Sequence, residues 1–233
     1  MKKFFKYFVT VLFMAALMAN LTWADHHTVS TVYVIHGIPG TDLGLAADLP
    51  VDVWVNDAVA IPGFKFEQVV GPLIFDPGTY NIKIAPAGTT TPVIEADIPL
   101  LPNETTVLIA HLTDEGGITA SKFVFDISPT TGHDARFSFI HAANAPVVDV
   151  TGEWTSGNIS PMFRVDEIQN GEKFTVDARA KSWIIKLWPT GVTTFVAKKK
   201  IKLKKQTYRL LFAVGSLEFE TFTFVGLNIK GLK

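Results

Sequence analysis

The first residues whose types and spacing could do chemistry are Val32–Gly40, written VYVIHGIPG. An apolar run that ends in His-Gly-x-x-Gly resembles the strand and oxyanion loop of an α/β-hydrolase. That fold also needs a G-x-S-x-G turn between a strand and a helix, followed by an acid and a His. The sequence contains no G-x-S-x-G and no helical segments for a doubly wound sheet. We therefore expect His36 to end a strand rather than to serve an esterase.

Two histidine–aspartate pairs recur, His36 with Asp52 and His141 with Asp149. A carboxylate that holds an imidazole is half of a catalytic dyad or half of a metal site. No third ligand stands at metal spacing near either pair, and H-E-x-x-H and EF-hand patterns are absent. Because the pair occurs twice, we expect a structural bond that fixes each strand end to the next loop.

A separate metal hypothesis concerns Asp25, His26 and His27. Cleavage after Ala24 would leave a free amine, two amides and an imidazole at the third position, a set that chelates Cu(II) or Ni(II) in a square plane. The alternative is a polar leader that binds nothing.

The run AKKKIKLKKQ (197–206) alternates apolar and cationic residues. This period of two predicts a strand with one apolar and one basic face. Such a ridge could bind lipopolysaccharide, acidic glycans, nucleic acid or anionic lipid heads. It could instead protect an exposed sheet edge, or dock on the acidic first half of the chain. The candidate polyanion-binding residues are Lys198, Lys199, Lys200, Lys202, Lys204 and Lys205.

Two tryptophans, Trp54 and Trp188, occupy outward positions of their predicted strands, among polar neighbours. Each could stack against a sugar or pack under a loop or interface. Tyr80 and Trp183 hold matching inner positions, and we expect both in the core.

These residues must be positioned by short strands, since turn formers such as Asp76-Pro77-Gly78 interrupt the apolar runs every 8–12 residues or so. The expected strands of the first half are 31–36, 51–55, 69–75, 79–85, 92–98, 105–112 and 118–126. The second half repeats the order, with matches at 136–141, 146–150, 183–191 and 207–214. The first copy carries an insertion at 37–49, acidic and rich in Gly, where we expect a ligand loop if one exists.

Charge divides the chain in the same place. Residues 28–132 hold 12 acidic and 3 basic side chains, a net of −9, whereas residues 133–233 hold 9 acidic and 15 basic, a net of +6. Opposite charges suggest two domains with separate surfaces and mutual attraction.

The N-terminal segment has the features of a secretory signal. Lys2, Lys3 and Lys6 precede an apolar run over about 8–19, and small residues precede a cut after Ala24. The chain has no Cys, which excludes disulfides, thiolate metal sites and lipoprotein attachment. That apolar run is too short to span a bilayer well, and no apolar run of about 18 residues follows it. We expect an exported protein that is periplasmic, cell-surface or secreted.

The repeated motifs resemble a known family. VIHGIPG…LPVDVWV and PGTYNIKIAPAGTTTP in the first copy, and FIHAANAPVVDVT in the second, are similar to the bacterial family called domain of unknown function 4397. Its members carry V-H-A-S-P-x-A-P-x-V-D-V, often twice, in exported proteins. Asn144 departs from this signature, and the second copy has KSWIIKLWPTGVTTF in place of the Pro-Gly-Thr-Tyr turn. The resemblance implies a pair of secreted or cell-surface β-sandwiches and supplies no catalytic residue.

The fold expected is all-β, with two tandem Ig-like antiparallel β-sandwich domains after a cleaved signal peptide. The expected parts are a signal peptide at 1–24, a flexible leader at 25–30, a first repeat at 31–127, a linker at 128–134 and a second repeat at 135–230.

The function expected is a non-enzymatic binding or structural module of the cell envelope, without a cofactor. The partner expected is an anionic envelope polymer, a glycan or another protein, and not a specific nucleic acid. The alternatives are a carbohydrate-active or metal-dependent envelope enzyme, and a copper or nickel carrier.

Overall fold

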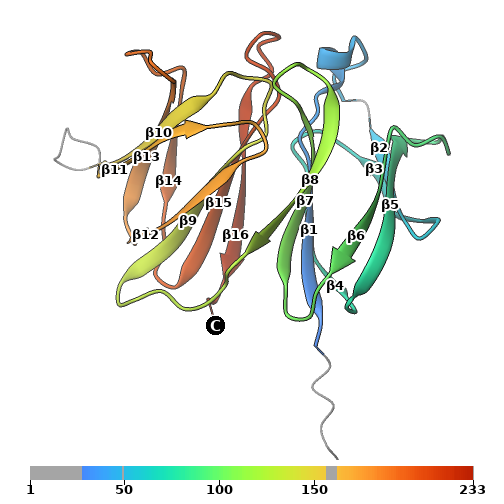
Figure 1. The fold of residues 1–233 in the computed structure, drawn as a ribbon, viewed down its shortest axis with the longest axis horizontal. Coiled ribbons are helices and arrows are strands. Elements are labelled where there is room, and N and C mark those ends of the chain that lie inside the picture. Colours follow the sequence, from blue (N-terminus) through green and yellow to red (C-terminus); the bar gives the residue numbers. More distant parts are fainter. Residues whose placement is uncertain (1–27, 49, 156–161, 233) are drawn as a thin grey trace, which may run out of the picture.

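The computed structural model describes residues 28–48, 50–155 and 162–232, and these form an all-β protein (Figure 1). Sixteen strands assemble into four sheets of four strands each. A 3-10 turn, η1 (Gly40–Leu43), lies in the segment between the first two strands. The predicted signal peptide and Asp25, His26 and His27 lie outside the described residues.

The first sandwich is built from the first eight strands. One sheet has the order β4-β1-β7-β8, and the other has the order β3-β2-β5-β6. Their bounds are β1 (Ser30–His36), β2 (Val51–Val55), β3 (Ala58–Phe64), β4 (Val69–Phe75), β5 (Gly78–Pro86), β6 (Ile94–Leu100), β7 (Thr105–Leu112) and β8 (Ile118–Phe125).

The second sandwich repeats this arrangement with the next eight strands, in the orders β12-β9-β15-β16 and β11-β10-β13-β14. Their bounds are β9 (Asp134–His141), β10 (Val148–Trp154), β11 (Phe163–Ile168), β12 (Lys173–Arg179), β13 (Ser182–Pro189), β14 (Ala197–Lys202), β15 (Thr207–Val214) and β16 (Thr223–Lys230). Counted from the first strand of each half, the two sets of sheet orders are the same. The predicted pair of β-sandwiches is confirmed.

The structure departs from the expected strands in three respects. In the second half, β11, β12 and β16 were not among the strands expected. The pairs β1·β7 and β9·β15 are parallel, while the other pairs are antiparallel. The strand β3 was not predicted, because Pro62 and Gly63 in its sequence are strand breakers. The strand forms because β3 lies at the edge of its sheet. There the missing N–H of Pro62 removes no hydrogen bond between neighbouring strands. Asn56 and Asp57 both have positive φ, 48° and 65°, and form the tight turn that leads into β3.

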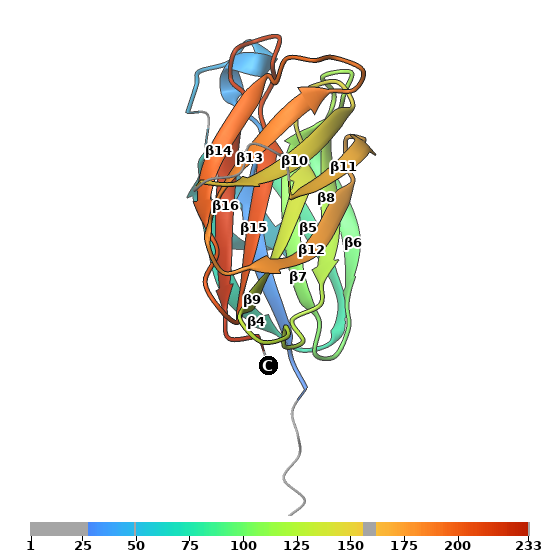
Figure 2. The same cartoon turned by 90° about the vertical axis from the view of Figure 1, so that its left-hand side faces the viewer.

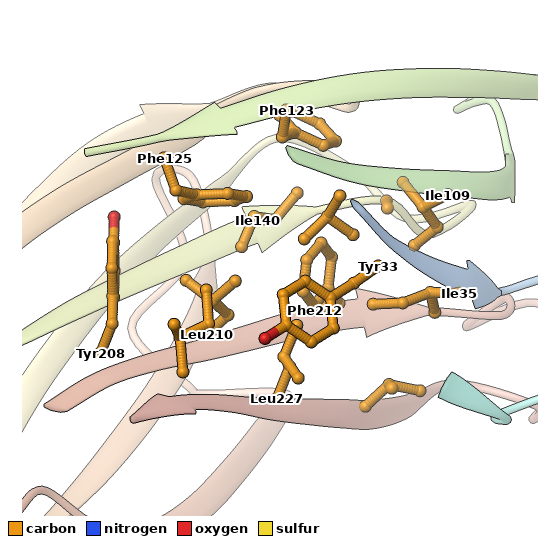
Figure 3. Close-up of a cluster of buried hydrophobic side chains, with 14 of the residues drawn as sticks. Tyr33, Ile35, Ile109, Phe123, Phe125, Ile140, Tyr208, Leu210, Phe212 and Leu227 are labelled. Atoms are coloured by element: carbon orange, nitrogen blue, oxygen red, sulfur yellow. The ribbon is translucent and has the colours of Figure 1, made fainter. Parts of the chain in front are cut away.

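The sandwiches do not stand apart on a linker, since a continuous apolar layer joins them. Its side chains come from β1, β7 and β8 on one side and from β9, β15 and β16 on the other (Figure 3). The labelled members are Tyr33, Ile35, Ile109, Phe123, Phe125, Ile140, Tyr208, Leu210, Phe212 and Leu227. Two further cores lie inside the sandwiches, so the four sheets form successive layers. The halves therefore meet mainly through hydrophobic contact, with an ion pair between Arg136 and Asp126 at 3.2 Å beside it.

Shared burial predicts shared unfolding. Phe212 has no exposed surface in the layer between the sandwiches, so Phe212→Ala should cost about 3–5 kcal/mol of unfolding free energy. Both sandwiches should still unfold in one urea transition, seen alike by far-UV circular dichroism and tryptophan fluorescence. The control Val124→Ala, at a side chain 46% exposed on β8, should change stability by less than about 0.5 kcal/mol. Two separate transitions in the unsubstituted protein would contradict this account.

Candidate functional site

The six candidate lysines lie on and just after β14, at the edge of the outermost sheet of the second sandwich. All six are exposed, whereas Ile201 and Leu203 between them are buried, at 4% and 3% exposure. The alternation predicted from AKKKIKLKKQ is therefore present in the structure. Lys198, Lys200 and Lys202 pair in register with Lys186, Ile184 and Ser182 of β13. Side chains at these positions share the outward face of the sheet.

The charge of these lysines is not neutralised within the described residues. The lysines that form ion pairs there are Lys65, Lys83, Lys122 and Lys186, and none of the six belongs to that set. Docking on the acidic first half is also wrong, because the sheet that contains β14 is the layer farthest from the first sandwich (Figures 1 and 2). The ridge presents its charge to the outside.

An aromatic pair lies on the same outer face. The Trp188 indole packs edge-on against Phe195, with the ring centroids 5.5 Å apart, and its Nε1 donates to the Thr151 hydroxyl at 3.0 Å. The ammonium groups of Lys186 and Lys198 lie 5.6 and 5.8 Å from the centroid of the Phe195 ring. We call Trp188, Phe195, Lys198, Lys200 and Lys202 the basic face.

The hydrogen bond to Thr151 and the contact with Phe195 fix the position of the Trp188 indole. The Lys186 ammonium forms an ion pair with Glu153 at 2.8 Å. Phe195 was missed by the sequence analysis, since it lies in the loop after β13, where strand periodicity gives no signal.

Trp54 belongs to a different place. It lies on the outer face of the first sandwich, beside a pocket of about 200 Å³ that Asp57, Lys83, Thr90 and Pro92 help to line. Its Nε1 is buried and has no hydrogen-bond partner. The Lys83 ammonium forms an ion pair with the Asp57 carboxylate at 2.6 Å, so its charge is already paired. The two predicted sugar-stacking residues thus occupy opposite outer layers and cannot contribute to one site.

The expected bonds between histidine and aspartate do not form. His36 Nδ1 accepts the N–H of Ile38 at 3.2 Å, and its Nε2 is buried without a partner. His141 Nε2 lies 3.0 Å from the carbonyl oxygen of Pro146. Each histidine ends a strand of a central sheet, whereas Asp52 and Asp149 lie in the outer sheets. The pairing predicted from sequence is therefore wrong, although each histidine still fastens its own following loop.

The two aspartates instead each accept hydrogen bonds from two other segments of the same sandwich. We call each of these carboxylates, Asp52 and Asp149, a carboxylate clasp. Asp52 accepts the N–H groups of Gly63 at 2.7 Å and Gly88 at 2.9 Å. These two bonds hold the pKa of Asp52 below its usual value. Because Gly63 lies near the end of the edge strand β3 and Gly88 lies in the turn after β5, one side chain links this strand to this turn at the same end of the sandwich.

Asp149 makes the corresponding contacts in the second sandwich. It accepts the N–H of Glu167 at 3.0 Å and the hydroxyl of Thr190 at 2.8 Å, and Arg164 donates to it at 2.6 Å. Burial by itself raises the pKa of this carboxyl, but these bonds and the Arg164 charge outweigh it and leave the pKa lowered. The Val-Asp-Val motif is thus explained as structural in both copies.

Neither a metal site nor a membrane span is found among the described residues. No group of three or more His, Asp or Glu side chains there could hold a metal ion. In the same ranges, no helix has the length and apolar character needed to cross a bilayer.

The chain is thus an all-β protein of two sandwiches held together by a common core, with a carboxylate clasp in each. The model of the family described as domain of unknown function (DUF4397) matches residues 30–151, and the chain belongs to that family.

The solved structures that match this chain are distant. The Bacillus anthracis TIE protein is 13% identical, with a TM-score of 0.26 over 82% of this chain, and the match spans 50% of its own length. The family CBM26 module CBMbc of Amy13K from Eubacterium rectale, solved with maltoheptaose, is 7% identical, with a TM-score of 0.26 over 84% of this chain and 95% of its own. No curated protein sequence matches.

Acid should destabilise the protein through its buried histidines. Burial lowers the pKa of His36 to about 4 and lowers the pKa values of His111 and His141 as well. The fold therefore favours neutral imidazoles, so stability is full above about pH 6.5 and is lost as the pH falls towards 4. For His36 alone the loss at pH 5 is about 2 kcal/mol.

His36→Asn, whose amide oxygen can still accept the Ile38 N–H, should reduce the difference in unfolding free energy between pH 7 and pH 5. His133→Asn, at an exposed residue, is the control and should leave that difference unchanged. An equal pH dependence in both variants would rule out His36 as a source.

The clasp of the second sandwich can be tested by Asp149→Ala. Its carboxylate is 4% exposed and has three partners, so its loss leaves the Glu167 N–H and the Thr190 hydroxyl without this acceptor and should cost about 2–3 kcal/mol of unfolding free energy. Asp166→Ala, which removes an exposed partner of the same Arg164, should cost less than about 1 kcal/mol. If urea denaturation gives the same loss of unfolding free energy for Asp149→Ala and Asp166→Ala, the buried contacts of Asp149 do not stabilise the fold more than an exposed ion pair does.

Proposed function

We propose that this protein is an exported, non-enzymatic binding module whose basic face holds an anionic polysaccharide of the cell envelope. The observation that carries the proposal is the row of exposed lysines on β14, which have no acidic partner among the described residues. Unpaired cations in a row create a positive potential that raises the local concentration of a polyanion.

The geometry of the basic face suits an extended, charged polymer. Alternate residues of a strand lie about 6.6–6.8 Å apart, so Lys198, Lys200 and Lys202 offer a regular line of charge. Trp188 and Phe195 lie next to that line and provide an apolar surface for a sugar ring. Lys186 and Glu153 add polar groups at the border of the aromatic pair, within reach of sugar hydroxyls.

Edge protection is the competing explanation, and the position of β14 fits it too. β14 lies at the edge of its sheet, where lysines deter pairing with another chain. Negative charges would protect the edge equally well. Reversing the charge therefore separates the two roles, since protection survives the reversal and polyanion binding does not.

The test is binding of the protein from Asp25 onward to an array of glycans and polyanions at low and high salt. At low salt, Lys198→Glu with Lys202→Glu should weaken binding roughly a thousandfold, since each reversal replaces an attraction of about 1 kcal/mol in water by a repulsion of about 1 kcal/mol. The control reverses two exposed lysines elsewhere, Lys65→Glu with Lys230→Glu. It changes the net charge equally, and at about 0.1 M salt, where the Debye length is about 10 Å, it should leave the affinity within about twofold.

Three results would decide between the roles. Binding that fades with salt and fails only in the Lys198/Lys202 variant supports the proposal. An equal loss of affinity in both double variants would show that binding depends on net charge alone and would overturn the proposal. The absence of binding to every member of the array would also overturn it. Trp188→Ala should weaken the part of the binding that resists high salt, because stacking is not screened.

A further inference from the structure

The interior of the first sandwich contains unfilled apolar space. A cavity of about 90 Å³ lies between its two sheets, with walls that include Val34, Val53, Ile82 and Leu108. A second pocket of about 90 Å³ lies beneath the 37–49 segment and shares Ile84, Ile94 and Ala110 with the first. The apolar space therefore extends along the sandwich, from its middle to the end covered by this segment.

The space exists because the first sandwich has small side chains where the second has large ones. β1 and β9 occupy equivalent places, and each ends in a histidine, so Val34 corresponds to Phe139. By the same count Val32 corresponds to Phe137. In the second sandwich these two phenylalanines are fully buried and both pack against Phe174. Valines in their place leave the first sandwich short of volume.

The difference is visible in the exposure of the central aliphatic residues. Ile82 and Leu108 line the cavity and are only partly buried. Their equivalents, by the register of the same strand pairs, are Ile185 and Leu211, which are 1% and 0% exposed. Residues that should form the centre of a closed core are thus open to solvent in the first sandwich only.

The polar side chains at the wall of the first cavity are already satisfied, whereas His36, which lines the second pocket, has a buried Nε2 without a partner. The Tyr80 hydroxyl donates to the carbonyl oxygen of Asp76, and Ser121 bonds to His111. Lys122 pairs with Glu104 at 2.6 Å and donates to the carbonyl of Pro99. A peptide in this space would leave its own N–H and C=O groups without partners, which is costly. A hydrocarbon chain has no such groups.

We propose that this cavity binds one aliphatic chain, such as the acyl chain of a lipid, with its polar end in solvent. A cavity of about 150 Å³ takes the six carbon atoms of benzene, so the cavity and the adjoining pocket, at about 90 Å³ each, together accommodate about seven carbon atoms of a chain. This site is in the other sandwich from the basic face and does not rest on the function proposed above.

The test uses uncharged probes, the 1-alkanols from butanol to decanol, so that the lysines play no part. Binding should tighten about threefold to fourfold for each added methylene, at about 0.8 kcal/mol per buried group, and then level off when the cavity is full. With 1-octanol, methyl NMR signals of Ile82 and Leu108 should shift. The signals of Ile185 and Leu211 serve as the control inside the same molecule and should not move.

Two variants locate the site. Val34→Phe places in the first sandwich the residue that the second already has, and should abolish the shifts. Ala96→Trp, at an exposed residue of the cavity wall, should block entry without changing the core. If Val34→Phe fails to fold, as judged by circular dichroism, Ala96→Trp decides. Shifts that are absent, equal in both sandwiches, or retained in both variants would overturn the proposal.

Discussion

The apolar layer between the two central sheets sets the position of every other surface. Side chains such as Ile35 and Ile109 of the first half and Leu210 and Phe212 of the second are almost completely buried there. Because both central sheets give one face to this layer, only their other faces remain to form the two sandwich cores. Among the described residues, the outer sheets are then the two sheets that keep a face away from both cores and the shared layer, and they face in opposite directions (Figure 1).

Hydrogen bonds join loops of the two halves at one end of the shared apolar layer. The 37–49 segment crosses from the first half towards the second, since Asp42 accepts a hydrogen bond from Thr221 at 2.6 Å and Gly37 accepts one from Gly215 at 3.3 Å. At the same level Asn170 donates to the carbonyl oxygens of Leu112 and Ala143, one from each half. The junction is thus hydrophobic in its interior and hydrogen-bonded at one end, which restricts hinge motion between the sandwiches.

Most of the strands could be predicted from the sequence because their period of two is strong and turn formers bound them. The alternation around Ile201 and Leu203 is an example, and the structure buries both. The packing of the halves could not be predicted. Tyr33, Ile35 and Ile109 look like ordinary core positions, and periodicity does not tell which of two sheets a buried face meets. The histidine–aspartate pairing failed for a related reason, since residues close in a motif can lie in different sheets.

The parallel pairs β1·β7 and β9·β15 also bear on how the chain is made. Thr31 pairs with Thr105, which lies 74 positions later (105 minus 31), and Arg136 pairs with Tyr208, 72 positions later (208 minus 136). Such distant partners give a high contact order and slow folding. During synthesis, moreover, a completed first sandwich would still lack the cover for Tyr33, Ile35 and Ile109. A partly synthesised chain therefore exposes an apolar sheet face until β9, β15 and β16 have been made and have packed on it. Chaperones or rapid synthesis of the second half must protect this face from aggregation.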